Sequence, residues 1–154
     1  MSVQIVLGSK SDMKVAEKAV AILKELGVKY RLSIASAHRT PELVDKLIAE
    51  ADAEVFIAIA GLSAALPGVI AARTIRPVIG VPVSGAVNLD SILSVVQMPP
   101  GVPVAGVGLD RGDNAALLAA EIIALKDEKV REALVKHRQK MKDKIVEDSK
   151  EVEV

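Results

Sequence analysis

Short runs of β-branched and other apolar residues recur along the chain, each bounded by polar residues, glycine or proline. Apolar runs of about four to eight residues are typical of buried strands, because both faces of a parallel sheet are covered. The pattern predicts five strands, at about 3–7, 29–35, 54–60, 77–83 and 103–107.

Segments with helical periodicity separate these runs. Apolar residues at three- and four-residue spacing predict a first helix over 12–26, which Gly27 ends. Thr40 has the character of an N-cap, with Pro41 at the first position of the second helix. Further helices are predicted at 64–74, 90–96, about 113–125 and about 127–149.

Strands that alternate with helices indicate a parallel sheet covered on both faces. The expected fold class is α/β, a three-layer α/β/α sandwich with a flavodoxin-like, doubly wound, five-stranded parallel sheet and a C-terminal helical extension. The expected strand order is 2-1-3-4-5. We see no linker or repeat in the sequence and expect one domain over 1–154.

Each of the first three predicted strands runs into a small, polar loop, at 8–12, 36–40 and 61–68. The carboxyl ends of parallel strands meet at one edge of the sheet, where α/β proteins bind ligands. Hydroxyls, helix-start amides, Asp12, His38 and Arg39 would converge there. The sequence therefore predicts a site for a phosphorylated small molecule that contains a proton-transfer residue.

Composition limits the partners, the chemistry and the location to be expected. Twenty basic and twenty acidic residues cancel, so charge gives no reason to expect nucleic acid or an anionic membrane as a partner. The chain has no cysteine, which excludes disulfides and thiolate chemistry. No stretch resembles a signal peptide or a membrane span, and a cytoplasmic protein is the expectation.

The apolar content is high for a small monomer. Hydrophobic residues make up 51% of the chain although Tyr30 and Phe56 are its only aromatics, and the mean hydropathy is +0.36. A core of small aliphatic side chains with closely approaching backbones follows. We expect a homo-oligomer that covers the apolar excess, including the predicted helix at 64–74, which is apolar nearly all round.

His38 is the candidate for proton transfer, because an imidazole titrates near neutral pH and can both give and take a proton. Arg39 offers a two-pronged donor for phosphate, although a surface salt bridge would also explain it. Asp12 either accepts hydrogen bonds from ribose hydroxyls or only occupies the first turn of a helix, and Ser9 and Ser11 either bind phosphate or only cap that helix. His137 lies in the charged C-terminal segment and is expected to be solvated.

The usual cofactor motifs are absent. The loop at 8–12 has neither Walker nor dinucleotide-binding spacing, and no histidines or carboxylates have metal-ligand spacing.

Five motifs follow one another along nearly the whole chain, namely Gly8–Asp12, Ser36–Thr40, Ala60–Gly68, Gln97-Met98-Pro99 with Gly101 and Pro103, and Asn114–Ala119. Together, in this order, they resemble the 5-(carboxyamino)imidazole ribonucleotide mutase family of purine biosynthesis. The resemblance implies a flavodoxin-like subunit of a homo-octamer that needs no metal or organic cofactor.

The resemblance also implies an activity and its residues. The carboxyl group would move from the exocyclic nitrogen of an aminoimidazole ribonucleotide to ring carbon C4, through carbon dioxide released and recaptured in the site, with His38 as the acid/base residue. The residues implied in substrate binding are Ser9, Ser11, Asp12, Ser36, Arg39, Gly61, Ser63 and Leu66.

One loop departs from the mutase pattern. The mutase branch usually has histidine where Ala65 stands, and Ser63 and Ala65 resemble a sister branch that carboxylates aminoimidazole ribonucleotide directly with carbon dioxide. That branch typically has lysine where Arg39 stands and arginine where Leu62 stands. Mutase is the prediction, and direct carboxylase is the alternative.

A non-enzymatic, flavodoxin-like nucleotide-binding module is the third possibility, since fold alone does not give function. A receiver domain would need an aspartate at the end of the third strand, where Ala60 and Gly61 stand. A flavin carrier would want aromatic residues in its loops, whereas both aromatics fall inside predicted strands.

Overall fold

The computed structural model describes residues 1–152, and Glu153 and Val154 lie outside the described residues. Strands and helices alternate along the chain as the sequence pattern predicts. The strands are β1 (Ser2–Leu7), β2 (Lys29–Ile34), β3 (Val55–Ala60), β4 (Val78–Pro82) and β5 (Ala105–Gly106). The helices are the 3-10 turn η1 (Lys10–Asp12), α1 (Met13–Glu25), α2 (Pro41–Glu50), α3 (Leu66–Ala71), α4 (Asn88–Val96), α5 (Gly112–Ala124) and α6 (Glu128–Glu151).

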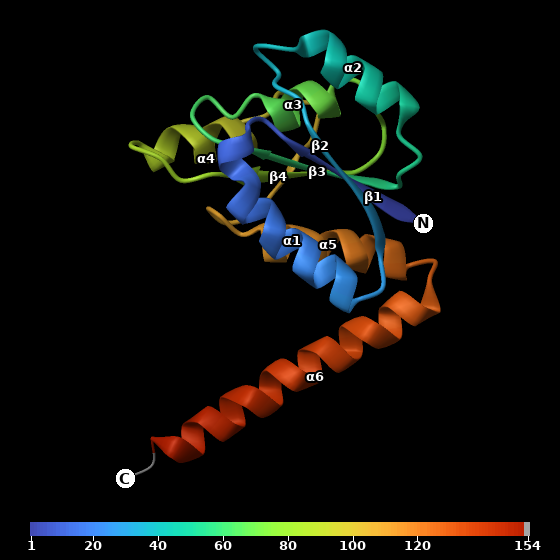
Figure 1. The fold of residues 1–154 in the computed structure, drawn as a ribbon, viewed down its shortest axis with the longest axis vertical. Coiled ribbons are helices and arrows are strands. Elements are labelled where there is room, and N and C mark those ends of the chain that lie inside the picture. The colour runs from blue at the N-terminus through green and yellow to red at the C-terminus, as the bar shows by residue number, and fades with distance from the viewer. Residues whose placement is uncertain (153–154) are drawn as a thin grey trace.

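The five strands form one sheet in the order β2-β1-β3-β4-β5 with every pair parallel, which confirms the predicted fold class and strand order. Residues that alternate along each strand point to opposite faces. Helices α1 and α5 cover one face, whereas α2, α3 and α4 lie on the other (Figure 1). All the strands point the same way, so the loops that follow β1, β2, β3 and β4 emerge at one edge.

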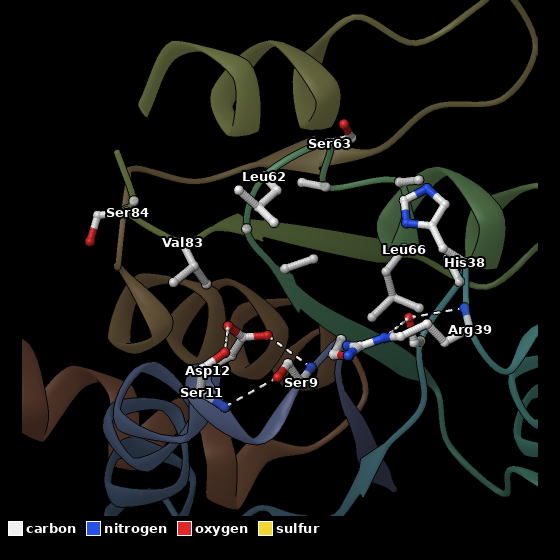
Figure 2. Close-up of a pocket in the computed structure, with 18 residues that line it drawn as sticks. Ser9, Ser11, Asp12, His38, Arg39, Leu62, Ser63, Leu66, Val83 and Ser84 are labelled. Atoms are coloured by element: carbon white, nitrogen blue, oxygen red, sulfur yellow. Dashed lines mark hydrogen bonds between the residues drawn. The ribbon is translucent and has the colours of Figure 1, made fainter. Parts of the chain in front are cut away.

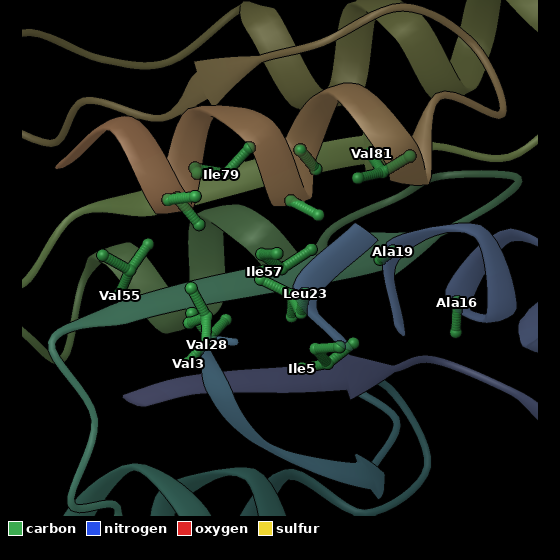
Figure 3. Close-up of a cluster of buried hydrophobic side chains, with 14 of the residues drawn as sticks. Val3, Ile5, Ala16, Ala19, Leu23, Val28, Val55, Ile57, Ile79 and Val81 are labelled. Carbon is green, nitrogen blue, oxygen red and sulfur yellow. The ribbon is translucent and has the colours of Figure 1, made fainter. Parts of the chain in front are cut away.

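The larger core lies between the sheet and the α1/α5 layer. Val3 and Ile5 of β1, Ile57 of β3 and Ile79 of β4 are 1% exposed or less and meet Leu23 of α1 there (Figure 3). The second core lies on the other face, around the completely buried ring of Phe56. Aliphatic side chains therefore fill both layers, as the composition predicts.

Small residues let α1 and α5 approach closely. Ala16 and Ala19 of α1 face Ala115, Ala116 and other alanines of α5, and all of them are completely buried. The first helix ends as predicted at Gly27, whose φ of 69° lies in the left-handed region, and the Val28 amide donates to the Leu23 carbonyl at 2.9 Å. This is the arrangement of a glycine C-cap.

Two elements are shorter than predicted. The helix predicted at 64–74 spans only Leu66–Ala71, and it begins at Leu66 because Pro67 lacks an amide proton and fits only into the first turn of a helix. Its buried side chains, Leu66, Pro67 and Ile70, pack within their own subunit, against β3 and β4. The fifth strand is reduced to Ala105–Gly106 at the edge of the sheet, after Pro103, which cannot donate a ladder hydrogen bond.

The C-terminal helix α6 begins beside α5 and projects away from the rest of the molecule (Figure 1). In its first turns, the side chains of Val130 and Leu134 are buried.

The prediction that His137 is solvated is wrong: its side chain is 12% exposed, and Nδ1 lies 3.2 Å from Oε1 of Glu25. This hydrogen bond lowers the pKa of Glu25. Within residues 1–152 no helix is both long and apolar enough to cross a membrane.

Candidate active site

A cavity of about 590 Å³ opens at the carboxyl edge of the sheet. Its walls come from the loops that follow four strands (Figure 2). The cavity contains all nine residues that the sequence analysis named as site residues, namely Ser9, Ser11, Asp12, Ser36, His38, Arg39, Gly61, Ser63 and Leu66. The topology thus brings three loops together that are far apart in the sequence.

The loop after β1 is built by a reciprocal cap. The Ser9 hydroxyl accepts a hydrogen bond from the Ser11 amide at 3.4 Å, and Oδ2 of Asp12 accepts one from the Ser9 amide at 3.0 Å. The Ser11 hydroxyl donates to Oδ1 of Asp12 at 3.1 Å. Capping is therefore one role of these residues, and lining the cavity is another.

Asp12 is only 6% exposed. Burial raises the pKa of its carboxyl group, although the hydrogen bonds from Ser11 and Ser9 and the charge of Arg39 oppose this. Because the pKa in the folded state is raised, ionised Asp12 costs stability at neutral pH, and this cost disappears once the pH falls below the usual range of an aspartate. The fold thus keeps a desolvated carboxylate in the cavity, which suits an acceptor for ligand hydroxyls.

The loop after β2 holds Arg39 across the cavity. Its Nε donates to the Ser36 hydroxyl at 3.3 Å, and Nη2 donates to the Gly8 carbonyl at 3.1 Å. Within residues 1–152, Nη1 has no protein partner, so one prong of the guanidinium is open to a ligand. The salt-bridge alternative for Arg39 has no counterpart among the described ion pairs of residues 1–152.

Thr40 stands at the N-cap position of α2 with Pro41 in the first turn, as the sequence predicts, but its hydroxyl makes no capping hydrogen bond. Its hydroxyl turns back to the start of its own loop, where Oγ1 accepts a hydrogen bond from the Ser36 amide at 2.9 Å and can donate to the Ser36 carbonyl at 3.3 Å. The hydroxyl is thus used within the loop, in competition with the amides at the start of α2. It fixes the segment that carries His38 and Arg39.

His38 is exposed at the mouth of the cavity, with its imidazole above Leu66 (Figure 2). The two residues come from different loops, and Leu66 itself is 1% exposed. The imidazole is therefore accessible to a ligand that enters the cavity. This placement suits a group that gives and takes a proton at a bound substrate.

The loop after β3 contains a strained residue. Leu62 has a φ of 54°, in the left-handed region that disfavours residues other than glycine, and its side chain is 78% exposed at the rim of the cavity. Ala65 lies in the same wall. Backbone strain of this kind costs on the order of 1–3 kcal/mol and collects at functional sites.

The sequence analysis missed the fourth wall, which consists of Val83, Ser84 and Gly85. These residues follow β4 directly, so the rule used for the first three loops applies to them as well. No group of three or more histidine, cysteine or carboxylate side chains within residues 1–152 is arranged to hold a metal ion.

The model of the AIR carboxylase family matches residues 2–144. This chain belongs to the AIR carboxylase family. Its relative from Methanocaldococcus jannaschii, named N5-carboxyaminoimidazole ribonucleotide mutase, is 58% identical over 149 residues, which cover 96% of this chain and 95% of the relative.

Two further proteins are similar to this AIR carboxylase family member over nearly its whole length. A probable N5-carboxyaminoimidazole ribonucleotide mutase from Methanobrevibacter smithii is 51% identical over 97% of this chain, which spans 45% of that longer protein. The crystal structure of PurE from Treponema denticola superposes with a TM-score of 0.90 and 34% identity, covering 99% of this chain and 98% of the other. The resemblance seen in the sequence motifs is confirmed.

Proposed function

We propose that this chain is a 5-(carboxyamino)imidazole ribonucleotide mutase, an isomerase of purine biosynthesis. The observation that carries the proposal is the gathering of His38, Arg39 and Asp12 in one cavity of about 590 Å³, in a chain 58% identical to a named mutase. That volume suits a mononucleotide, since ligand sites span roughly 300–1,000 Å³. The binding and catalytic roles given to individual residues are part of this proposal.

The reaction divides into two steps that His38 connects. In the first, the bond between the exocyclic nitrogen and the carboxyl carbon breaks, carbon dioxide is released, and the His38 imidazolium protonates the nitrogen. In the second, C4 of the ring attacks the carbon dioxide, and neutral His38 removes the proton that C4 carried. The product is 4-carboxy-5-aminoimidazole ribonucleotide, and His38 returns to its starting protonation state.

The cavity offers one distinct group for each part of the substrate. The open prong of Arg39 and the hydroxyls of Ser9 and Ser36 bind the phosphate, because these hydroxyls accept hydrogen bonds within the protein and still have a proton to donate. Ser11 lies beside them and contributes once its hydroxyl turns from Asp12 to the ligand. The desolvated carboxylate of Asp12 accepts from ribose hydroxyls. Gly61, Ser63 and Leu66 form the wall beside the base and the carbon dioxide.

Direct carboxylation of aminoimidazole ribonucleotide, a lyase activity in the reverse direction, is the second candidate. It is favoured by Ser63 and Ala65, which lie in the cavity wall where they can meet the carboxyl carbon. Catalysis without metal or cofactor remains a prediction for either reaction, and so does a cytoplasmic location.

An assay with two substrates decides between the activities. Purified protein receives either the carboxyamino nucleotide or aminoimidazole ribonucleotide with bicarbonate, and the carboxylated product is followed by its absorbance. We expect efficient turnover of the first substrate at low bicarbonate. Efficient turnover of only the second substrate would make the protein a direct carboxylase, and turnover of neither would leave a non-enzymatic nucleotide-binding module.

A homo-oligomer is also part of the proposal, with eight subunits by family resemblance. The apolar excess lies on exposed helix faces, not on α3 as the sequence suggested. Met141, Ile145 and Val146 of α6 are 55%, 68% and 56% exposed, and Leu89 of α4 is 60% exposed. Surfaces of this kind are normally covered by a partner.

Light scattering at micromolar concentration tests the assembly. We expect a particle several times heavier than the 16.2 kDa chain. The double variant Met141→Lys/Ile145→Lys, which charges the projecting face of α6 without touching its buried turns, should shift the distribution to smaller species. A wild-type protein that scatters as a stable monomer would contradict the proposal.

A further inference from the structure

The fourth wall of the cavity is fixed by hydrogen bonds to residues that do not line the cavity. Val83, Ser84 and Gly85 form this wall, and Ser84 lies on the far side of the cavity from His38 (Figure 2). Ser84 and Gly85 are exposed and belong to no strand or helix. The position of such a segment depends on its hydrogen bonds.

Two side chains from outside the cavity bind the two amides of this turn. Oδ1 of Asp110 accepts from the Ser84 amide at 2.9 Å, and Oδ1 of Asn88 accepts from the Gly85 amide at 2.9 Å. Neither amide is free to bind an anion. The Asp110 carboxylate also places negative charge behind the turn, so this wall is a poor place for a phosphate.

Asp110 is anchored at a junction of three elements. Its amide donates to the Pro82 carbonyl at the end of β4, at 2.9 Å, and its carbonyl accepts from Nζ of Lys18 on α1, at 3.1 Å. The residue immediately precedes Arg111 and helix α5. The carboxylate that holds Ser84 is therefore fixed by the sheet and by a helix.

The backbone of Asp110 has a conformation that glycine would adopt with less strain. Its φ is 58°, a left-handed conformation in which glycine is the least strained residue. Aspartate and asparagine are tolerated there better than other residues, but at a cost. Glycine at this position would relieve the strain but could not accept the hydrogen bond from the Ser84 amide. We take this hydrogen bond as the contribution of the Asp110 carboxylate.

We propose that Asp110 is a positioning residue of the active site, which fixes the Ser84–Gly85 wall against the nucleoside part of the substrate by accepting the Ser84 amide proton. The inference rests on the proposed function for the identity of the substrate. The phosphate end of the site, at Arg39 and the loop after β1, does not depend on Asp110.

Two variants separate the contributions of Asp110. Asp110→Asn keeps an oxygen acceptor and tolerates the left-handed backbone, whereas Asp110→Gly suits the backbone better but has no acceptor. Asp113→Asn is the matched control, because it removes a neighbouring charge that pairs with Arg111 and does not contact the cavity. Circular dichroism and melting temperature check the fold of each variant.

Calorimetric titration with aminoimidazole ribonucleotide, and with inorganic phosphate as a second probe, gives the readout. We expect the nucleotide Kd to rise about tenfold in Asp110→Gly, equivalent to about 1.4 kcal/mol. We expect it to stay within about twofold of wild type in Asp110→Asn and Asp113→Asn. The affinity for inorganic phosphate should be the same in all four proteins, because phosphate binds at the opposite end.

Amide hydrogen exchange at Ser84 tests the inference independently of any activity. The Ser84 amide should be protected in the wild type and in Asp110→Asn, and should exchange rapidly in Asp110→Gly. An unchanged nucleotide Kd or an unchanged Ser84 exchange rate in Asp110→Gly would overturn the proposal, as would equal loss in Asp110→Asn. A wild type that binds no nucleotide refutes the proposed function instead, and the exchange experiment then decides the role of Asp110 alone.

Discussion

His38→Asn is expected to reduce turnover of the carboxyamino nucleotide by at least about 10²–10⁴-fold, the usual contribution of a positioned general acid or base. The asparagine side chain fits the space at the cavity mouth but cannot deliver a proton to the exocyclic nitrogen or remove one from C4. Steady-state kinetics measure the turnover, and calorimetric titration with aminoimidazole ribonucleotide measures the nucleotide affinity separately. The Kd should change little, because we assign the phosphate and ribose contacts to other residues.

The chain provides a matched control for this variant in its only other histidine. His137 is paired with Glu25 on the α6 side of the molecule and is absent from the cavity. His137→Asn should therefore retain wild-type turnover. Near-normal activity in a folded His38→Asn protein would remove His38 from the mechanism and leave the proton transfers to another group.

Gly112→Ala should destabilise the fold by about 3 kcal/mol, the upper end of what overpacking usually costs. Gly112 is the first residue of α5 and is buried against α1, and a methyl group there would overlap the backbone carbonyl of Val15. Helix propensity alone argues for the opposite sign, since alanine is better than glycine in a helix by about 1 kcal/mol. Packing wins because a backbone carbonyl cannot move aside as a flexible side chain can.

Urea denaturation followed by circular dichroism measures the free energy of unfolding of this variant. Gly85→Ala is the control, since a methyl group at Gly85 meets no atom within 4 Å, and it should stay within about 0.5 kcal/mol of wild type. An equally stable Gly112→Ala protein would mean that α1 and α5 separate without penalty. The closely packed alanine interface would then not be the main source of stability in this layer.

The residues that line the candidate site were largely predictable from sequence, for a topological reason. Three polar loops each follow an apolar strand, and parallel strands must present these loops at one edge. This rule predicts that Asp12, His38 and Arg39 lie together, and the cavity contains all three. The same rule would have found Ser84, had the segment after the fourth strand been treated in the same way.

Predictions from neighbouring residues failed for two side chains whose hydrogen-bond partners the local sequence does not reveal. Thr40 is the N-cap residue that the sequence predicts, yet its hydroxyl binds the Ser36 amide within its own loop and not an amide of α2. His137 stands in a highly charged helix, yet it packs against Glu25 from a segment 112 residues away. Pairings of this kind depend on how elements approach one another, which a periodic pattern does not encode.

The sequence by itself determined the alternation of strands and helices and the edge at which the chemistry collects. Each of these follows from periodicity, from caps such as Gly27 and from the geometry of parallel strands, all of which act over short stretches of chain. Only the tertiary structure decided which side chains hold the walls of the cavity. Asp110 reaches Ser84 across 26 residues because β4, α1 and the start of α5 meet at one point, and that meeting exists only once both layers have packed on the sheet.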